Sequence, residues 1–173
     1  TFDDWLEGQE EIIVPELIKR ELAATMFVTV QVANWRKTAF PVMRLAHANG
    51  IEIANHTITH PSLTDIPFEK AKIEIDSARK VIMDSVPGAK CLTFAYPMGT
   101  KNPEVIRWIE REHIAARAVN AADEKTIKYD FDLDSADYFK IPTARIWHII
   151  TLEKVSRWLT YAENGGGMLT FMM

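Results

Sequence analysis

Short apolar runs alternate with longer amphipathic stretches along almost the whole chain, and this alternation limits the possible folds more than any other feature. The runs over 25–30, 51–54, 91–96, 114–119 and 168–173 are dominated by apolar residues, which is typical of buried strands. The stretches between them place apolar residues three or four positions apart, as helices with one buried face do. Strands that alternate with helices predict a parallel sheet in an α/β architecture.

Helices are expected over 10–22, 41–49, 68–82, 103–113 and 151–164, and one more strand over 141–150. Pro15 indicates either a kink in the first helix or a helix that begins at that point. Periodicity does not separate an open sheet from a closed barrel. In both architectures the functional site lies at the carboxyl ends of the strands.

Composition narrows the class of protein. The chain has 173 residues, which suits a single domain over 1–173 with a sizeable core. Its net charge is −4, from 20 basic and 24 acidic side chains, and no basic stripe is present, which argues against a nucleic-acid partner. Cys91 is the one cysteine, so the chain forms no internal disulfide. No apolar run approaches the ~20 residues of a transmembrane helix. The oligomeric state stays open.

Polar side chains follow three of the predicted strands. Asp3 and Asp4 follow Thr1-Phe2, which reads as the end of a first strand, and His56 and His60 follow the strand over 51–54. The segment 96–99, with the sequence Tyr-Pro-Met-Gly, follows a third strand. Because parallel strands end at the same edge of a sheet, these three loops are expected to converge.

The His-x-x-x-His spacing indicates a metal site. On a helical turn, residues four apart lie on one side, so His56 and His60 could reach one ion. Two imidazoles and one carboxylate form a common site for zinc or a similar divalent metal. Asp4 would supply the carboxylate, and Asp3 would act on water. The alternatives are an incidental surface histidine pair and an Asp-Asp turn or helix cap.

The chain resembles the polysaccharide deacetylases (NodB-homology domain, carbohydrate esterase family 4) in three motifs that occur in the same order: Thr1-Phe2-Asp3-Asp4, His56-Thr57-x-x-His60 and Tyr96-Pro97-x-Gly99. This resemblance implies a distorted (β/α)7 TIM-like barrel and a divalent metal, most often zinc. It implies hydrolysis of an acetyl group, most often N-acetyl, on a carbohydrate polymer or oligomer. A secreted or cell-envelope location is also implied.

The resemblance assigns roles to the residues of these motifs. Asp3 would be the general base, and Asp4, His56 and His60 the metal ligands. Met98, which precedes the glycine of the third motif, would donate its backbone N–H to the oxyanion.

Three aromatic or cyclic side chains are candidates for substrate contact. Tyr96 and Pro97 belong to the third motif. Trp5 directly follows the paired aspartates and is the best candidate for stacking on a sugar ring.

Two departures from the family pattern stand out. Ala95 occupies the position where many members have an arginine that orients the catalytic base. Arg117 or Arg145 would substitute, unless they form ordinary salt bridges. The histidine of the fifth motif, which serves as the general acid, does not follow the strand over 168–173, and His148 is a weak replacement. We therefore expect a fragment of a longer chain, with the barrel incomplete at both termini.

Two rival functions remain open at this point. One is a carbohydrate-binding protein of the same fold with impaired catalysis, which the missing acid and Ala95 favour. The other is an unrelated metal hydrolase, such as an amidase or a phosphoesterase. The motif loops hold no basic residue except Lys101, which argues against a phosphate substrate.

Overall fold

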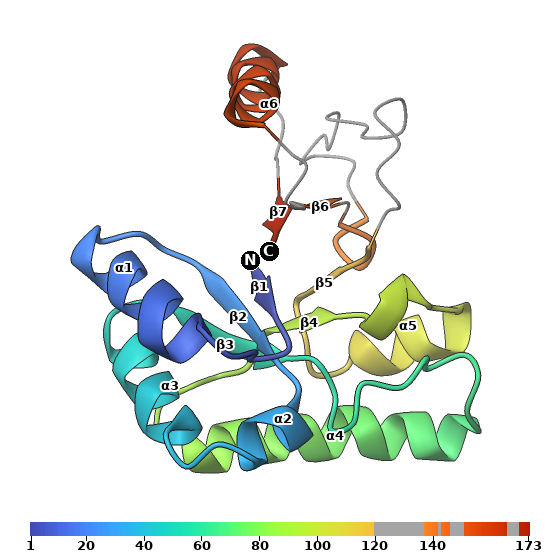
Figure 1. The fold of residues 1–173 in the computed structure, drawn as a ribbon. Helices are drawn as coiled ribbons and strands as arrows, with labels where there is room; N and C mark the ends of the chain where they lie inside the picture. Colours follow the sequence, from blue (N-terminus) through green and yellow to red (C-terminus); the bar gives the residue numbers. More distant parts are fainter. Residues whose placement is uncertain (120–136, 142, 146–150, 166–169) are drawn as a thin grey trace.

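The computed structural model of the protein describes residues 1–119, 137–141, 143–145, 151–165 and 170–173 (Figure 1). His148 and most of the acidic segment before Asp137 lie outside these residues. Within the described part, no helix has the combination of length and apolar character that crossing a membrane requires.

Five parallel strands form one sheet, and they lie side by side in chain order. They are β1 (Phe2–Asp3), β2 (Thr25–Val28), β3 (Glu52–Asn55), β4 (Thr93–Ala95) and β5 (Ala115–Arg117). Each pairs with the next in parallel register, as the alternation of strands and helices predicts. Each expected run overlaps one observed strand among the described residues, and β2, β4 and β5 are shorter than their runs.

A second parallel pair, β6 (Ala144–Arg145) and β7 (Phe171–Met172), connects the two edges of the main sheet (Figure 1). The Met173 N–H donates to the Thr1 carbonyl over 3.0 Å, which joins β7 to β1. At the other edge, Arg117 and Ile141 form a parallel bridge. The α/β fold and the distorted TIM-like barrel are thereby confirmed.

The helices of the described residues are α1 (Val14–Lys19), α2 (Val30–Asn34), α3 (Ala39–Ala48), α4 (Phe68–Ser85), α5 (Pro103–Ile109) and α6 (Leu152–Gly165). Helices α2, α3 and α4 lie together on one side of the five-stranded sheet, whereas α6 lies apart from this sheet, beyond β7 (Figure 1). A π-helical turn over Gln9–Ile13 precedes α1, and a 3-10 turn over Pro97–Gly99 follows β4. Pro15 lies in the first turn of α1, so it marks a helix start. The apolar face of α4 is buried as predicted.

The apolar pattern did not predict helix α2, because Val30 reads as the end of a strand. In the structure, the N–H groups of Val30 and Gln31 donate to the carbonyls of Thr57 and Ile58 over 3.1 and 2.8 Å. Because these two N–H groups bind the loop and not a neighbouring strand, the chain leaves β2 here and continues as a short helix. The start of α2 is thus fixed by the loop that holds the two histidines.

Candidate active site

The paired aspartates lie where β1 ends and the chain turns sharply. Asp4 and Trp5 both have positive φ angles, 71° and 65°, which non-glycine residues rarely adopt. Two hydrogen bonds hold this turn: the Asp4 N–H donates to the Phe27 carbonyl over 2.9 Å, and Gln9 Nε2 donates to the Asp3 carbonyl over 2.8 Å. Both carboxylates line one pocket as a result.

The two histidines follow β3 on an irregular loop over 56–60, not on a helical turn. The expectation that a helical turn brings them together is therefore wrong. Thr57 and His60 have positive φ angles of 68° and 61°, and this turns the chain back on itself. The two imidazole rings meet edge to face, with their centroids 4.7 Å apart. Thr57 helps to shape the loop, since its Oγ1 accepts the His60 N–H over 3.1 Å.

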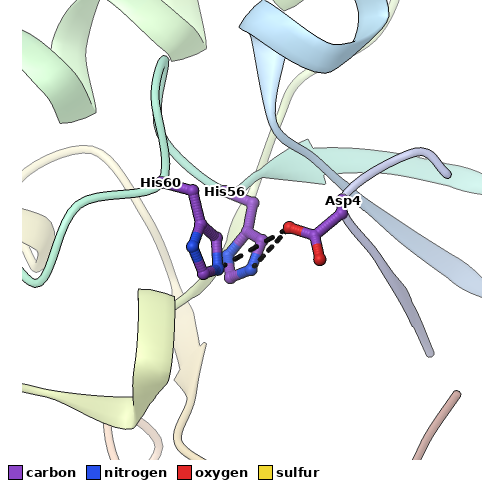
Figure 2. Close-up of side chains that lie close together, drawn as sticks. All are labelled: Asp4, His56 and His60. Atoms are coloured by element: carbon purple, nitrogen blue, oxygen red, sulfur yellow. Dashed lines mark ion pairs between the residues drawn. The ribbon is translucent and has the colours of Figure 1, made fainter.

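Asp4, His56 and His60 converge on one point (Figure 2). The Nε2 atoms of both histidines lie 3.6 Å from Asp4 Oδ1, and the candidate ligand atoms all lie within 4.8 Å of one another. Ligands about 2.1 Å from a tetrahedral zinc ion are separated by about 3.4 Å. The spacing and the chemistry of these three side chains fit one divalent metal.

Neighbouring groups orient His56 and Asp4 within this cluster. His56 Nδ1 lies 2.8 Å from the Ala95 carbonyl oxygen, which only accepts hydrogen bonds, so Nδ1 carries the proton and Nε2 faces the site. Burial lowers the pKa of His56, which favours the neutral form that a metal needs. Thr29 Oγ1 donates to Asp4 Oδ1 over 3.0 Å and fixes that carboxylate.

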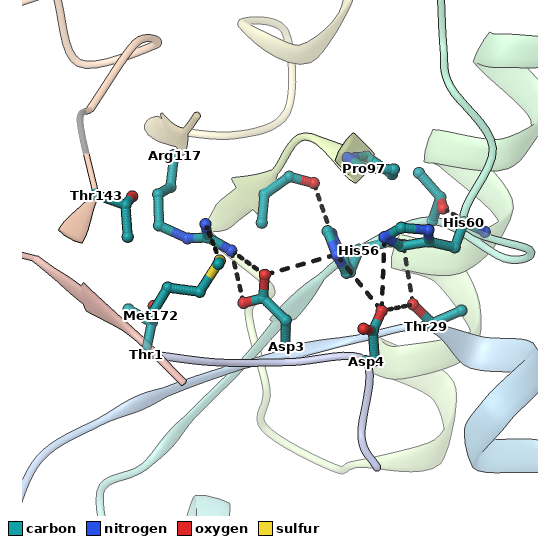
Figure 3. Close-up of polar contacts among 12 residues, drawn as sticks. Thr1, Asp3, Asp4, Thr29, His56, His60, Pro97, Arg117, Thr143 and Met172 are labelled. Atoms are coloured by element: carbon teal, nitrogen blue, oxygen red, sulfur yellow. Dashed lines mark hydrogen bonds and ion pairs between the residues drawn. The ribbon is translucent and has the colours of Figure 1, made fainter. Parts of the chain in front are cut away.

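Asp3 has a different partner. Arg117 on β5 forms an ion pair with it, in which Nη2 bridges both carboxylate oxygens, 2.6 Å from Oδ1 and 2.5 Å from Oδ2 (Figure 3). The arginine side chain is 3% exposed and the aspartate 14%. Asp3 Oδ2 also lies 3.8 Å from His56 Nε2, beside the ligand set. Of the two arginines considered above, Arg117 therefore contacts Asp3, whereas the Arg145 side chain lies outside the described part.

The site opens into a pocket of about 430 Å³. Its lining combines the acidic and imidazole groups with apolar side chains: Asp3, Asp4, Leu6, His56, His60, Tyr96, Met98, Val119, Met172 and Met173. Among the described residues, the lining contains two histidines, His56 and His60, and neither of them is the expected general acid.

The third motif borders this pocket through Tyr96 and Met98. The Tyr96 hydroxyl donates to the Phe139 carbonyl over 3.1 Å, and burial raises the pKa of Tyr96, so the group stays protonated. Met98 has a positive φ of 56°, and its backbone N–H has no acceptor among the described residues. Pro97 is buried and is not part of the pocket lining.

Trp5 does not face the pocket. Its side chain is 0% exposed, and its indole Nε1 donates to Glu10 Oε1 over 2.9 Å. Glu10 also accepts from Arg36 and Thr38, and these hydrogen bonds outweigh burial and lower the pKa of Glu10. The positive φ angles after Asp3 direct the indole into the core. This corrects the expectation that Trp5 stacks on a sugar, and Leu6 takes its place in the lining.

Sequence reasoning missed several supporting residues. Thr29 follows β2 directly, so the same rule of polar groups at strand ends would have found it. Leu6 and Val119 give no such signal, because an isolated apolar residue after a strand reads as part of the core.

The fold and the site together define a parallel α/β barrel with a candidate metal centre and a paired acidic group at the carboxyl ends of its strands. The sequence model described as polysaccharide deacetylase matches residues 1–115, and the chain belongs to this family. A chitooligosaccharide deacetylase from Sinorhizobium fredii is 28% identical over 120 residues, which cover 67% of this chain and 53% of the relative. The chain thus spans about half the length of that curated relative.

Two solved structures show the same fold. The Streptococcus pyogenes deacetylase PplD, in complex with acetate, superposes with a TM-score of 0.74 at 18% identity, covering 90% of this chain and 67% of that one. A CE4 family pseudoenzyme from Bacillus anthracis superposes with a TM-score of 0.61 at 15% identity, covering 98% and 62%. At these identities the likeness concerns the fold, which an enzyme and a pseudoenzyme share.

Proposed function

We propose that this protein is a metal-dependent hydrolase that removes acetyl groups, chiefly N-acetyl groups, from a carbohydrate polymer or oligomer. The observation that supports this most strongly is the convergence of Asp4, His56 and His60 beside a second carboxylate, Asp3, that has its own arginine partner. Membership of the polysaccharide deacetylase family supports the class of reaction.

The metal would be held by Asp4, His56 and His60, and zinc suits two imidazoles and one carboxylate best. A bound divalent ion polarises the acetyl carbonyl and lowers the pKa of water. Thr29 and the Ala95 carbonyl orient two of these ligands, so little rearrangement would accompany binding.

Asp3 would accept the proton of the attacking water. Arg117 occupies both carboxylate oxygens, but a carboxylate offers about four lone-pair positions, so Asp3 retains the capacity to accept a proton. The contact of Nη2 with both oxygens orients the carboxylate, which general-base catalysis requires. Arg117, on β5, would thus serve the role for which many members use an arginine at the position of Ala95.

The oxyanion would accept a hydrogen bond from the backbone N–H of Met98, which borders the pocket. Leu6, Val119 and Tyr96 would face the substrate from the pocket wall. The implied secreted or cell-envelope location fits an acetylated glycan substrate and stays a prediction.

The decisive experiment uses the full-length protein. Bound metal is measured by elemental analysis, and acetate release from N-acetylglucosamine oligomers is followed with and without a chelator. We expect about one divalent ion per chain, and acetate release that the chelator abolishes and zinc restores. Absence of metal and of acetate release from every acetylated glycan tested would overturn the proposal. Glycan binding without acetate release would instead favour the non-catalytic alternative.

Asp3→Asn tests the assignment of roles. Because Asp3 is placed as the base and not as a ligand, we expect turnover to be lost while the metal content stays at the wild-type level. Loss of the metal from this variant would show that Asp3 is a ligand.

A further inference from the structure

The loop that holds the two histidines needs support from outside itself. Thr57 and His60 both have positive φ angles, and neither is a glycine, so this backbone conformation is disfavoured on its own. The loop over 56–60 is not helical, and the contact between His60 N–H and Thr57 Oγ1 is its main internal bond.

Glu74, in the middle of α4, supplies much of that support. Its Oε2 accepts the N–H groups of Ile58 and Thr59 over 2.9 and 2.8 Å, and its Oε1 accepts the Thr59 hydroxyl over 2.7 Å. Consecutive backbone N–H groups that point the same way form a concave site for an anionic oxygen. Here a carboxylate of the same chain fills that site with charge-assisted hydrogen bonds.

The other N–H groups of the loop have acceptors elsewhere. Thr57 N–H donates to Asn55 Oδ1 over 2.9 Å, and His60 N–H donates to Thr57 Oγ1. Glu74 therefore accepts two of the four backbone N–H groups between Thr57 and His60. On the opposite side, the start of α2 binds the loop carbonyls, so the loop is fixed between α2 and α4.

The two candidate metal ligands differ in how they depend on this loop. His56 is buried, and the Ala95 carbonyl orients its ring directly. His60 is 30% exposed and follows the two residues that Glu74 binds. The position of His60 Nε2, 3.6 Å from Asp4 Oδ1, thus rests on the loop backbone.

We propose that Glu74 is a positioning residue for the metal site: by binding the backbone between the two histidines, it places His60 for coordination. This inference rests on the proposed metal-dependent function. Without the carboxylate, two consecutive N–H groups lose their acceptor and His60 samples positions away from Asp4. Removal of groups that orient metal ligands typically weakens metal binding by about 10–100-fold.

The test uses the full-length apo-protein and two readouts that do not depend on activity. The zinc dissociation constant is measured by competition with a chromophoric chelator, and the coordination geometry is followed by the visible absorption of bound Co²⁺. For Glu74→Ala we expect about 10–100-fold weaker zinc binding and an altered Co²⁺ spectrum. Glu74→Gln keeps an oxygen that accepts both N–H groups, so we expect zinc binding within about threefold of the wild type.

Glu69→Ala is the matched control on the same helix. Glu69 is 78% exposed and pairs with Lys72 at 2.6 Å, about 7.5 Å along the helix from Glu74. We expect wild-type zinc binding from this variant. If Glu74→Ala does not fold, Glu74→Asp replaces it: the carboxylate is retained but withdrawn by one methylene, and zinc binding should be weaker than in Glu74→Gln.

The outcomes separate this inference from the proposed function. If the wild type binds zinc and Glu74→Ala binds it equally well, whatever its melting temperature, Glu74 is merely structural and the inference is overturned. The same holds if Glu74→Gln is impaired as strongly as Glu74→Ala. If the wild type itself binds neither zinc nor Co²⁺, the proposed metal-dependent function fails, and this inference fails with it.

Discussion

Replacing Arg117 with glutamine should both destabilise the fold and impair the reaction. The ion pair with Asp3 connects β5 to β1 at contacts of 2.6 and 2.5 Å, between side chains that are 3% and 14% exposed. Breaking a buried ion pair costs about 3–5 kcal/mol, because the remaining charge is left without a partner. Asp3 retains some contact with solvent, so we expect a loss at the lower end, about 3 kcal/mol.

The catalytic effect of Arg117→Gln follows from the freedom that Asp3 gains. General-base catalysis contributes about 10²–10⁴-fold and depends on orientation. We therefore expect kcat to fall about 100-fold. The metal content should not change, since the arginine contacts none of the three candidate ligands directly. Arg117→Lys keeps the positive charge but not the second guanidinium nitrogen, which contacts Met172 Sδ, and it should recover part of both losses.

Both losses can be measured separately. Urea unfolding of the metal-free protein, followed by tryptophan fluorescence, gives the free energy of unfolding, and acetate release at saturating zinc gives kcat. Arg107→Gln on α5 is the matched control, because Arg107 is exposed and remote from the pocket. If Arg117→Gln unfolds within 1 kcal/mol of the wild type and keeps its kcat, the ion pair neither stabilises the barrel nor orients the base.

Two further predictions concern the surroundings of the site. Burial lowers the pKa of His113 from 6.5 to about 4, so the unfolded chain binds a proton between these values and the folded one does not. The free energy of unfolding should fall by about 3 kcal/mol as the pH decreases from 6.5 to 4. In urea unfolding, the difference in this free energy between the wild type and His113→Gln should become smaller over the same pH range. A constant difference would contradict the lowered pKa of His113. Gly99 has φ +74°, and an added Cβ would lie 2.8 Å from the Val119 carbonyl oxygen. Gly99→Ala should therefore displace the Met98 N–H and reduce kcat at least tenfold, which corresponds to an activation free energy about 1.4 kcal/mol or more higher. Unchanged turnover would argue against Met98 as the oxyanion donor.

The sequence determined the architecture and the location of the site through two local patterns. The alternation of apolar runs with amphipathic stretches predicted a parallel α/β sheet, because strands of one direction require a crossover between them. The position of Asp3, Asp4, His56 and His60 at strand ends and in the loops that follow them then placed them together, since parallel strands end at one edge. Both the architecture and the location of the site could be predicted without knowing which residues distant in the sequence contact each other.

The tertiary structure decided which partners those residues have. Arg117 and Arg145 were equivalent in sequence, and the register of β5 against the other strands brings Arg117 to Asp3, 114 positions away. The two histidines meet through a loop that Glu74 binds from α4, not through the helical turn that their spacing suggested.

Trp5 gives the same lesson for a single side chain. An aromatic residue after paired aspartates is compatible with a sugar-stacking surface and with the core, and the sequence pattern does not distinguish them. Two consecutive positive φ angles direct the indole toward Glu10. Periodic patterns report which face of an element is apolar, but the direction of a side chain in a tight turn and its distant partners are fixed when the sheet closes and the loops pack.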